Sequence, residues 1–273
     1  MKFGTTIRNM GPAATRGRIV HAAECAESLG LDHIWVVDHV AIPPDDAEGS
    51  EGRWIDPLAM LAFLSAATRT IELGVSILVL PYRPALLTAK WIASIQELCG
   101  ERLYLGVGAG WMEAEFQALG LDRRQRGRTT DEAIQFIRSC FDASDDVVEA
   151  HGQPFLFRPR PQRPPIFVGG MSDAALKRAA TLGDGWIPMG INPEKLAGRY
   201  EKLRALAEAV GRPCPEVVVI GSLPDDQALA VQQLGQCKEL GVTHYIQSSR
   251  YVTEHEFDAL ADRVADLKKQ LGD

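Results

Sequence analysis

A histidine stands where a short apolar run gives way to polar residues. His39 follows Asp38 directly after the run Ile34-Trp-Val-Val37. An imidazole can accept or donate a proton near neutral pH, which makes His39 the best candidate for a general acid or base. The alternative is a structural histidine beside an aspartate that caps a loop. We favour the catalytic role because polar residues at the carboxyl end of a strand lie where α/β enzymes bind ligands.

Three glycines lie at the end of a second apolar run. Residues 103–107 have the pattern of a strand, and Gly106, Gly108 and Gly110 would let the backbone come close to a ligand. The dinucleotide fingerprint G-x-G-x-x-G would need a third glycine where Trp111 stands, and an acidic residue about 20 residues further on. The chain has arginines downstream instead. The glycines therefore serve either another kind of cofactor site or only a tight turn.

A glycine pair precedes another expected helix. Gly169 and Gly170 follow an apolar run, and Ser172 can cap the helix after them. Free N–H groups at the positive end of a helix suit a phosphate, although a plain turn after a strand explains the pattern about as well. The four arginines between positions 123 and 128 form either a solvated face, which we favour, or a contact for an anionic tail.

Composition restricts the classes of partner and the compartment. The chain has 273 residues, 46% of them hydrophobic, and a net charge of −7. Nucleic acids and anionic membranes need a positive face, so neither is expected as the main partner. No apolar run approaches the roughly 18 residues of a membrane span, and no signal peptide is visible after Met1. The five cysteines lack metal-ligand spacing, which favours free thiols in a reducing cytosol and no metal site.

A repeated strand–helix pattern must position these residues. Eight short apolar runs alternate with helical segments that have recognisable start and stop residues. We expect strands at 3–8, 33–38, 73–80, 103–108, 166–169, 185–188, 217–221 and 244–248. With no linker visible, this pattern indicates one α/β domain over residues 1–273, a (β/α)8 TIM barrel, with a doubly wound open sheet as the alternative. Insertions between strands four and five, at 113–119 and around 147–157, are expected to cover the active site.

Polar caps mark the expected helix starts. They are Asp56 before Pro57, Ser172, Asn192 before Pro193, Asp225, and two capping boxes, Thr129 with Glu132 and Thr253 with Glu256. In a barrel, the carboxyl ends of all strands meet at one mouth. The strand pattern would bring four residues to that mouth, namely Asp38, Ser76, Gly108 and Gly169.

Six motifs, in the same order along nearly the whole chain, resemble the bacterial-luciferase-like flavin and deazaflavin oxidoreductases. They are Trp35-Val-Val-Asp-His39, Leu73-Gly-Val-Ser-Ile77, Pro81-Tyr-Arg-Pro84, Leu105-Gly-Val-Gly-Ala-Gly-Trp111 with Glu115-Phe116, Pro165-Ile-Phe-Val-Gly-Gly170, and Gly183-Asp-Gly-Trp-Ile-Pro188. Within this family the chain is most similar to the coenzyme F420-dependent branch.

The resemblance implies how a cofactor would lie. Its tricyclic ring would sit in the barrel mouth, against a bulge in the third strand that contains a cis peptide between Ser76 and Ile77. The glycine turn is expected to contact the cofactor, and the polar tail would run to the loop after strand five. The residues implied for these two contacts are Gly108, Ala109 and Gly110, and Gly169, Gly170 and Ser172.

Two further roles follow from the resemblance. Asp38 and His39 match the pair that contacts the ring in F420 members, where the histidine is a proton donor or base. Some F420 sugar dehydrogenases carry a glutamate proton acceptor after the glycine turn, where this chain has Trp111. Oxidation of a sugar by that acid pair is therefore not expected, and Trp111 is expected to wall an apolar substrate pocket.

The resemblance predicts an oxidoreductase that moves a hydride between C5 of coenzyme F420 and a small organic substrate, with His39 handling the proton. One alternative is an FMN-dependent monooxygenase, because both rings fit the same slot and fold does not settle function. The other is a non-catalytic flavin-binding paralogue. We expect a cytoplasmic homodimer.

Overall fold

Eight parallel strands close into a barrel in the order β1-β10-β9-β8-β7-β4-β3-β2. The computed structural model describes residues 1–144, 146–190, 192–248 and 250–272. The barrel strands are β1 (Lys2–Thr6), β2 (His33–Val36), β3 (Glu72–Val79), β4 (Leu103–Gly108), β7 (Ile166–Gly169), β8 (Gly185–Ile187), β9 (Glu216–Gly221) and β10 (His244–Gln247). Each lies where the sequence predicts a strand, so the TIM barrel is confirmed and the open sheet is excluded.

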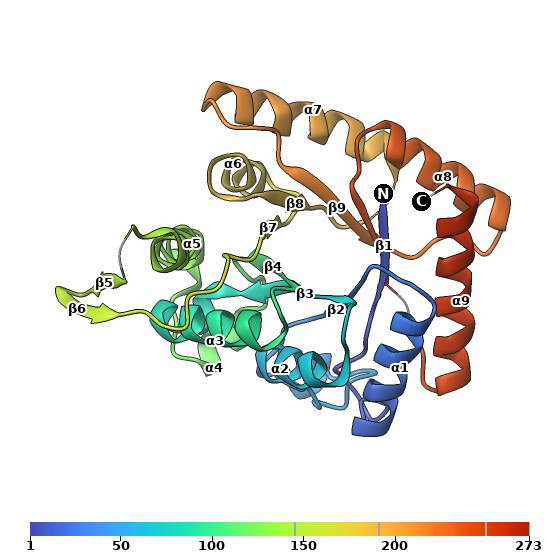
Figure 1. Ribbon diagram of the computed structural model, residues 1–273, viewed down its shortest axis with the longest axis horizontal. Coiled ribbons are helices and arrows are strands. Elements are labelled where there is room, and N and C mark those ends of the chain that lie inside the picture. The colour runs from blue at the N-terminus through green and yellow to red at the C-terminus, as the bar shows by residue number, and fades with distance from the viewer. Residues whose placement is uncertain (145, 191, 249, 273) are drawn as a thin grey trace.

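α-Helices surround the barrel (Figure 1). They are α1 (Arg16–Ser28), α2 (Pro57–Ala67), α3 (Ala85–Leu98), α4 (Glu113–Ala118), α5 (Arg126–Asp142), α6 (Asp173–Leu182), α7 (Pro193–Ala209), α8 (Gln227–Glu239) and α9 (Glu254–Gln270). The two ends of the chain meet, because β1 pairs with β10 and α9 packs against α1 and β1. Over the described ranges, no helix combines the length and apolar character that crossing a membrane requires.

Most predicted helix starts are confirmed. Asp56 caps α2 by accepting from the N–H groups of Leu58 and Ala59. Ser172 and Asn192 each accept a backbone N–H in the first turn of α6 and α7. The capping box that opens α9 is present, with both of its hydrogen bonds made between Thr253 and Glu256.

Two predicted starts are wrong. Thr129 is inside α5, since that helix begins at Arg126, and its hydroxyl donates to the carbonyl of Gln125. Asp226, and not Asp225, caps α8, because its carboxylate accepts from Leu229 N–H. In both regions the residues before the apolar positions are polar, so periodicity alone leaves the first turn undefined.

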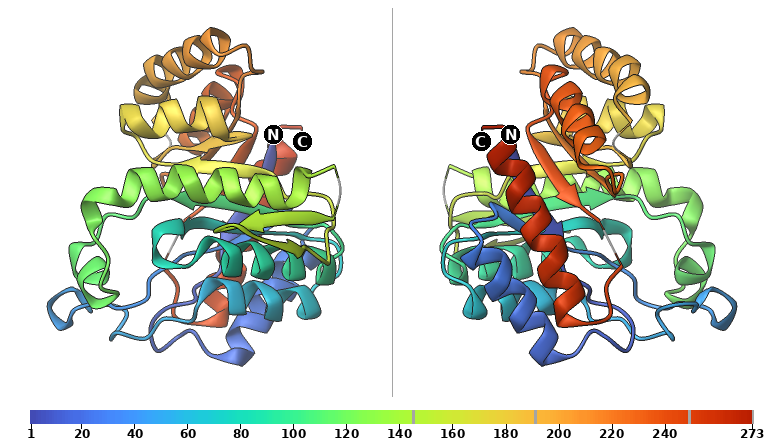
Figure 2. Two further views of the ribbon diagram at one scale, coloured as in Figure 1. Left: turned by 90° about the vertical axis from the view of Figure 1, so that its left-hand side faces the viewer. Right: turned by 90° about the vertical axis from the view of Figure 1, so that its right-hand side faces the viewer.

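Extra segments lie between β4 and β7, as predicted. The short helix α4 comes first, and after α5 follows an antiparallel hairpin of β5 (Val147–Ala150) and β6 (Gln153–Leu156). The hairpin lies beside α3 and α5, whereas α4 lies at one end of the molecule next to the loop that precedes α2 (Figure 2). Of the two insertions, α4 is therefore the one that reaches the barrel mouth.

Aromatic rings and two histidines fill the interior of the barrel. Trp35 stacks on Phe167 and donates from Nε1 to Nδ1 of His33 at 2.8 Å. The ring of His33 lies 5.5 Å from that of His244. Burial lowers the pKa of His33 well below its usual value and that of His244 to about 4. Both imidazoles are therefore neutral packing residues near the amino-terminal ends of the strands.

All five cysteines are free thiols. Cys99, Cys140 and Cys237 are buried, and burial raises the pKa of Cys140 and of Cys237 to about 11. A thiol that stays protonated is a poor nucleophile and a poor metal ligand. No group of three or more His, Cys, Asp or Glu side chains placed to hold a metal ion occurs in the described part of the chain.

Candidate active site

The four residues predicted to share one mouth do so. Asp38 follows β2, Ser76 lies in the last half of β3, and Gly108 and Gly169 are the final residues of β4 and β7. The strands are parallel neighbours in a closed barrel, which brings these positions to its carboxyl-terminal end. A hydrogen bond from Val79 N–H to the Asp38 carboxylate, 2.9 Å long, ties the ends of β2 and β3 together.

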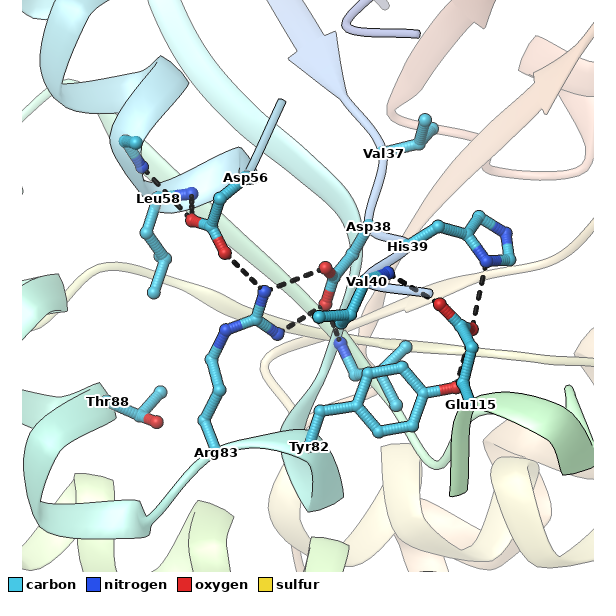
Figure 3. A network of polar contacts seen from close by, with 12 residues as sticks. Val37, Asp38, His39, Val40, Asp56, Leu58, Tyr82, Arg83, Thr88 and Glu115 are labelled. Atoms are coloured by element: carbon cyan, nitrogen blue, oxygen red, sulfur yellow. Dashed lines mark hydrogen bonds and ion pairs between the residues drawn. The ribbon is translucent and has the colours of Figure 1, made fainter. Parts of the chain in front are cut away.

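The segment that leaves β2 carries the predicted acid–base residue. Val37 and His39 point to one side of the chain and Asp38 to the other (Figure 3). The His39 side chain is 19% exposed, and its Nδ1 lies 3.0 Å from Oε2 of Glu115. An ionised carboxylate can only accept hydrogen bonds, so the hydrogen of this pair sits on Nδ1. Nε2 of His39 is then the atom that can accept a proton.

Glu115, on α4, is a buried carboxylate. Its Oε1 accepts from the backbone N–H groups of Val40 at 2.5 Å and Ala41 at 3.1 Å. Its Oε2 accepts from the Tyr82 hydroxyl at 2.8 Å as well as from His39. Burial alone would raise the pKa of this carboxyl, but these donors outweigh it and the pKa of Glu115 is lowered. Glu115 therefore stays ionised and fixes both the orientation and the tautomer of His39.

An arginine ties Asp38 into the scaffold. Arg83 binds both oxygens of Asp38, at 2.7 and 2.9 Å, and also Asp56 at 2.7 Å. Burial would lower the pKa of Arg83, but the two carboxylates raise it above its usual value. The Asp38 side chain has no exposed surface. Its carboxylate is thus buried against Val79 and Arg83, on the other side of the chain from His39, and contact of Asp38 with a cofactor stays a prediction.

Two tryptophans flank the His39 ring. The centroid of Trp54 lies 4.6 Å away, and that of Trp111 lies 6.2 Å away with its plane nearly perpendicular, at 85°. Trp111 is 67% exposed and therefore stands at the open side of this cluster. The position next to His39 suits a wall of the substrate pocket, and that role stays a prediction.

The expected bulge is present in β3. Its pairing with β4 changes register in the middle of the strand, and the peptide between Ser76 and Ile77 is cis, as predicted. Ile77 occupies the space beside two glycines: a Cβ added to Gly108 would lie 1.9 Å from Ile77 Cδ1, and one added to Gly169 would lie 2.5 Å from Cγ2. The missing side chains at Gly108 and Gly169 thus accommodate Ile77, and contact of either glycine with a cofactor stays a prediction.

The backbone conformation after β4 requires a glycine at position 110. Gly110 has a φ of 75°, and a Cβ there would lie 2.7 Å from Val79. Only glycine adopts this conformation without strain. Ala109 and Gly110 therefore lie in the connection that carries the chain from β4 to Trp111, and the contact of this segment with a cofactor stays a prediction.

The turn from Gly169 to Ser172 has the features of an anion site. Gly170 has a φ of 121°, and a Cβ there would meet only Ala175 at 3.2 Å. The hydroxyl of Ser172 accepts from Ala175 N–H and so caps α6. The other early N–H groups of that helix have no acceptor within the helix itself and define its positive end. Phosphate binding there is a prediction that this geometry fits.

The sequence interpretation missed the residues that hold His39 in place. Glu115, Tyr82 and Arg83 stand in the motifs that carry the family resemblance, but no spacing rule links them to His39, which precedes them by 43 to 76 positions. Trp54 was missed for the same reason. A signal was nevertheless present, because Glu115 is an acidic residue on the apolar side of a short expected helix, next to Phe116.

Comparison with known proteins assigns the chain to a family. The profile of the family described as luciferase-like monooxygenase matches residues 1–264. The chain belongs to the luciferase-like monooxygenase family. It is 30% identical to an uncharacterized protein of Mycobacterium tuberculosis, over 90% of both chains.

Luciferase-like relatives with assigned activities catalyse different reactions. The chain is 30% identical to the 5,10-methylenetetrahydromethanopterin reductase of Methanolobus tindarius, over 74% of this chain and 59% of the other. It is 34% identical to an FMNH2-dependent dimethylsulfone monooxygenase of Pseudomonas fluorescens, over 54% of this chain and 42% of the other. The family thus supports an oxidoreductase and leaves the cofactor open.

Solved structures share the fold over the whole chain. The monooxygenase RslO1 from Streptomyces bottropensis superposes with a TM-score of 0.81 at 19% identity, covering 100% of both chains. An F420-dependent secondary alcohol dehydrogenase superposes with a TM-score of 0.80 at 17% identity, covering 100% of this chain and 99% of the other. At these identities the likeness concerns the fold.

Proposed function

We propose that the protein is an F420-dependent oxidoreductase in which His39 transfers the proton that accompanies hydride transfer to or from a small organic substrate. The observation that carries this proposal is the pair formed by His39 and the buried carboxylate of Glu115, 3.0 Å apart. Because the carboxylate holds Nδ1, Nε2 is left to exchange the proton at the mouth.

The residues around the mouth fit such a cofactor. The bulge at Ser76 and Ile77 would adjoin the ring, and the turn from Gly169 to Ser172 would bind the phosphate through backbone N–H groups at the positive end of α6. When bound, F420 would supply hydride exchange at C5. The chain itself supplies the base, the anion site and the two tryptophans that limit the access of water to His39.

Acid–base geometry favours F420 over FMN. Oxidation of an alcohol or reduction of a carbonyl requires a proton to leave or reach the substrate oxygen, and a positioned imidazole does this. The FMN-dependent monooxygenase is the second candidate, and the relative in Pseudomonas fluorescens supports it. A non-catalytic flavin-binding paralogue would have no use for a buried carboxylate on its histidine.

A fluorescence titration of the purified protein with F420 and with FMN tests the cofactor. We expect saturable binding of F420 and weaker binding of FMN. Binding of FMN without binding of F420 would move the protein to the monooxygenase class. Binding without reduction or turnover, over a panel of alcohols, aldehydes and ketones, would support the paralogue.

The His39→Ala variant tests the proton-transfer role. We expect turnover to fall by about 10²–10⁴-fold, as is typical when a general acid or base is lost, while cofactor affinity changes little. His255→Ala is the matched control, because His255 is an exposed histidine on α9. A lower melting temperature with unchanged turnover of the folded His39→Ala protein would make His39 a structural residue.

Substitution of Gly170 by Asp tests the phosphate turn. The change adds a negative charge at the expected phosphate and a side chain where φ is 121°. We expect cofactor affinity to fall by at least about 10-fold, the equivalent of about 1.4 kcal/mol. Gly170→Ala separates the backbone effect from the charge effect, and equal affinities of the Asp variant and the wild type would place the phosphate elsewhere.

A further inference from the structure

A cavity of about 350 Å³ opens at the barrel mouth between the ends of β1, β2, β9 and β10. This volume is within the range of small-molecule sites. Part of its wall is apolar, formed by Ile7, Met10 and Val37. Val37 points to the same side of the chain as His39, so the cavity continues the side of the mouth that the proposed base faces (Figure 3).

Two arginines line the cavity, and none of the described residues that line it is acidic. Arg8 contacts only neutral acceptors, with Nη1 2.7 Å from the carbonyl oxygen of Tyr251 and Nη2 3.3 Å from that of Gly49. Its Nε is buried without a hydrogen-bond partner. Arg250 is exposed, and neither arginine has a carboxylate partner within the described ranges. In a chain of net charge −7, two unpaired cations in one cavity point to an anionic ligand.

The cavity lies across the mouth from the predicted phosphate turn. In the strand order, β1 and β7 are four strands apart in either direction around the barrel. Arg8 follows β1, and Gly169 ends β7. A cofactor with its phosphate at the end of β7 and its ring at the mouth would leave the β1 side to the other reactant.

We propose that Arg8 and Arg250 bind a carboxylate of the substrate, which makes the substrate a small organic acid with an apolar segment. The proposal rests on the proposed function, because it assigns the cofactor to the opposite side of the mouth. A guanidinium pairs with a carboxylate through two parallel hydrogen bonds, and the apolar wall would hold the carbon chain between this anion and His39. The arginines thus fix which end of the substrate faces the proposed base.

The test uses simple acids as probes. Butyrate, hexanoate, benzoate and phenylacetate, each beside its uncharged amide, are titrated calorimetrically into the protein, first without cofactor and then saturated with the cofactor that binds. We expect at least one acid to bind at least about 10-fold more tightly than its amide, as hydrogen bonds to charged groups predict. No preference for any acid over its amide overturns the proposal.

Arginine variants assign the preference to this cavity. Arg250→Gln and Arg8→Gln should each remove most of it, and Arg204→Gln, at an exposed arginine on α7, should retain it. Arg250 is exposed, so its variant keeps the test informative if Arg8→Gln fails to fold. A preference retained in Arg250→Gln overturns the proposal.

The cofactor titration distinguishes a carboxylate of the substrate from the phosphate of the cofactor as the anion that the two arginines bind. We expect cofactor affinity in Arg250→Gln to stay within about twofold of the wild type, because the phosphate is assigned to the β7 side. A fall in cofactor affinity of about 10-fold or more would mean that the arginines bind the cofactor, and would overturn the substrate assignment. Acid binding is also measured without cofactor, so failure of F420 to bind would contradict the proposed function alone.

Discussion

Replacing Glu115 by Gln tests how the scaffold controls His39. The two oxygens of Glu115 have separate partners: Oε1 accepts from Val40 and Ala41, and Oε2 accepts from Tyr82 and His39. A glutamine can keep its carbonyl oxygen on the two backbone donors. Its amide N–H groups then occupy the place of Oε2 and face two groups that were donors.

The substitution should lower turnover strongly and the stability of the fold only moderately. The Tyr82 hydroxyl can accept from the new amide, but His39 can do so only with a bare Nδ1, which moves its hydrogen to Nε2. The proposed base is then blocked, and we expect turnover to fall by about 10²–10⁴-fold. Stability should fall by only about 1.5–3 kcal/mol, the contribution of a hydrogen bond to a charged group.

The measurements are steady-state turnover with its pH profile, urea unfolding, and the tautomer of His39 from ¹⁵N chemical shifts. Tyr82→Phe is the matched control, since it removes one donor to Glu115 and leaves the carboxylate on His39. Its unfolding free energy should drop by about 1 kcal/mol with turnover within a few-fold of the wild type. Wild-type turnover in Glu115→Gln, with the hydrogen shown to be on Nε2, would refute the proposed role of this pair.

Two further tests concern the fold that carries the site. Burial lowers the pKa of His244 to about 4, so on acidification this histidine is protonated in the unfolded chain before it is protonated in the folded protein. The free energy of unfolding should be highest above about pH 6.5 and fall by up to about 3 kcal/mol as the pH drops to about 4. Urea titrations should show a smaller loss in His244→Gln. Gly106→Ala should destabilise by more than about 3 kcal/mol, because its Cβ would lie 2.2 Å from the carbonyl oxygen of Val75. Gly198→Ala, inside α7 with open space around it, should instead stabilise by up to about 1 kcal/mol, and equal melting temperatures of the two variants would contradict this account of the strand glycine.

The strands were predictable because each is a short apolar run whose ends are marked by polar residues or glycine. Their order followed too, since eight strand–helix units with right-handed connections close in only one common way. The start of α5 was not predictable in the same way. Arg126, Gly127 and Arg128 precede its apolar positions, and a polar first turn has no periodicity to find.

The candidate site was predictable only where strand ends define it. His39 and Gly169 could be placed at the mouth because one follows a strand and the other ends one, whereas Arg83 and Glu115 act through contacts between distant segments. Whether the carboxylate of Asp38 or that of Glu115 contacts His39 depends on the side of the chain on which each side chain lies. That choice is made by the Arg83 ion pair, which holds Asp38 on the side away from His39.

The short helix α4 links the pocket wall to the acid–base chemistry. It carries Glu115, which fixes His39, and it follows directly on the turn that places Trp111 against the same imidazole. A rigid shift of α4 would therefore change the tautomer control and the access to Nε2 together. The backbone N–H groups of Val40 and Ala41 oppose such a shift, because they bind the same carboxylate and join α4 to the segment after β2. Substitutions that change the substrate without loss of turnover are accordingly expected at Trp111 and around the β1 cavity, and not on the buried face of α4.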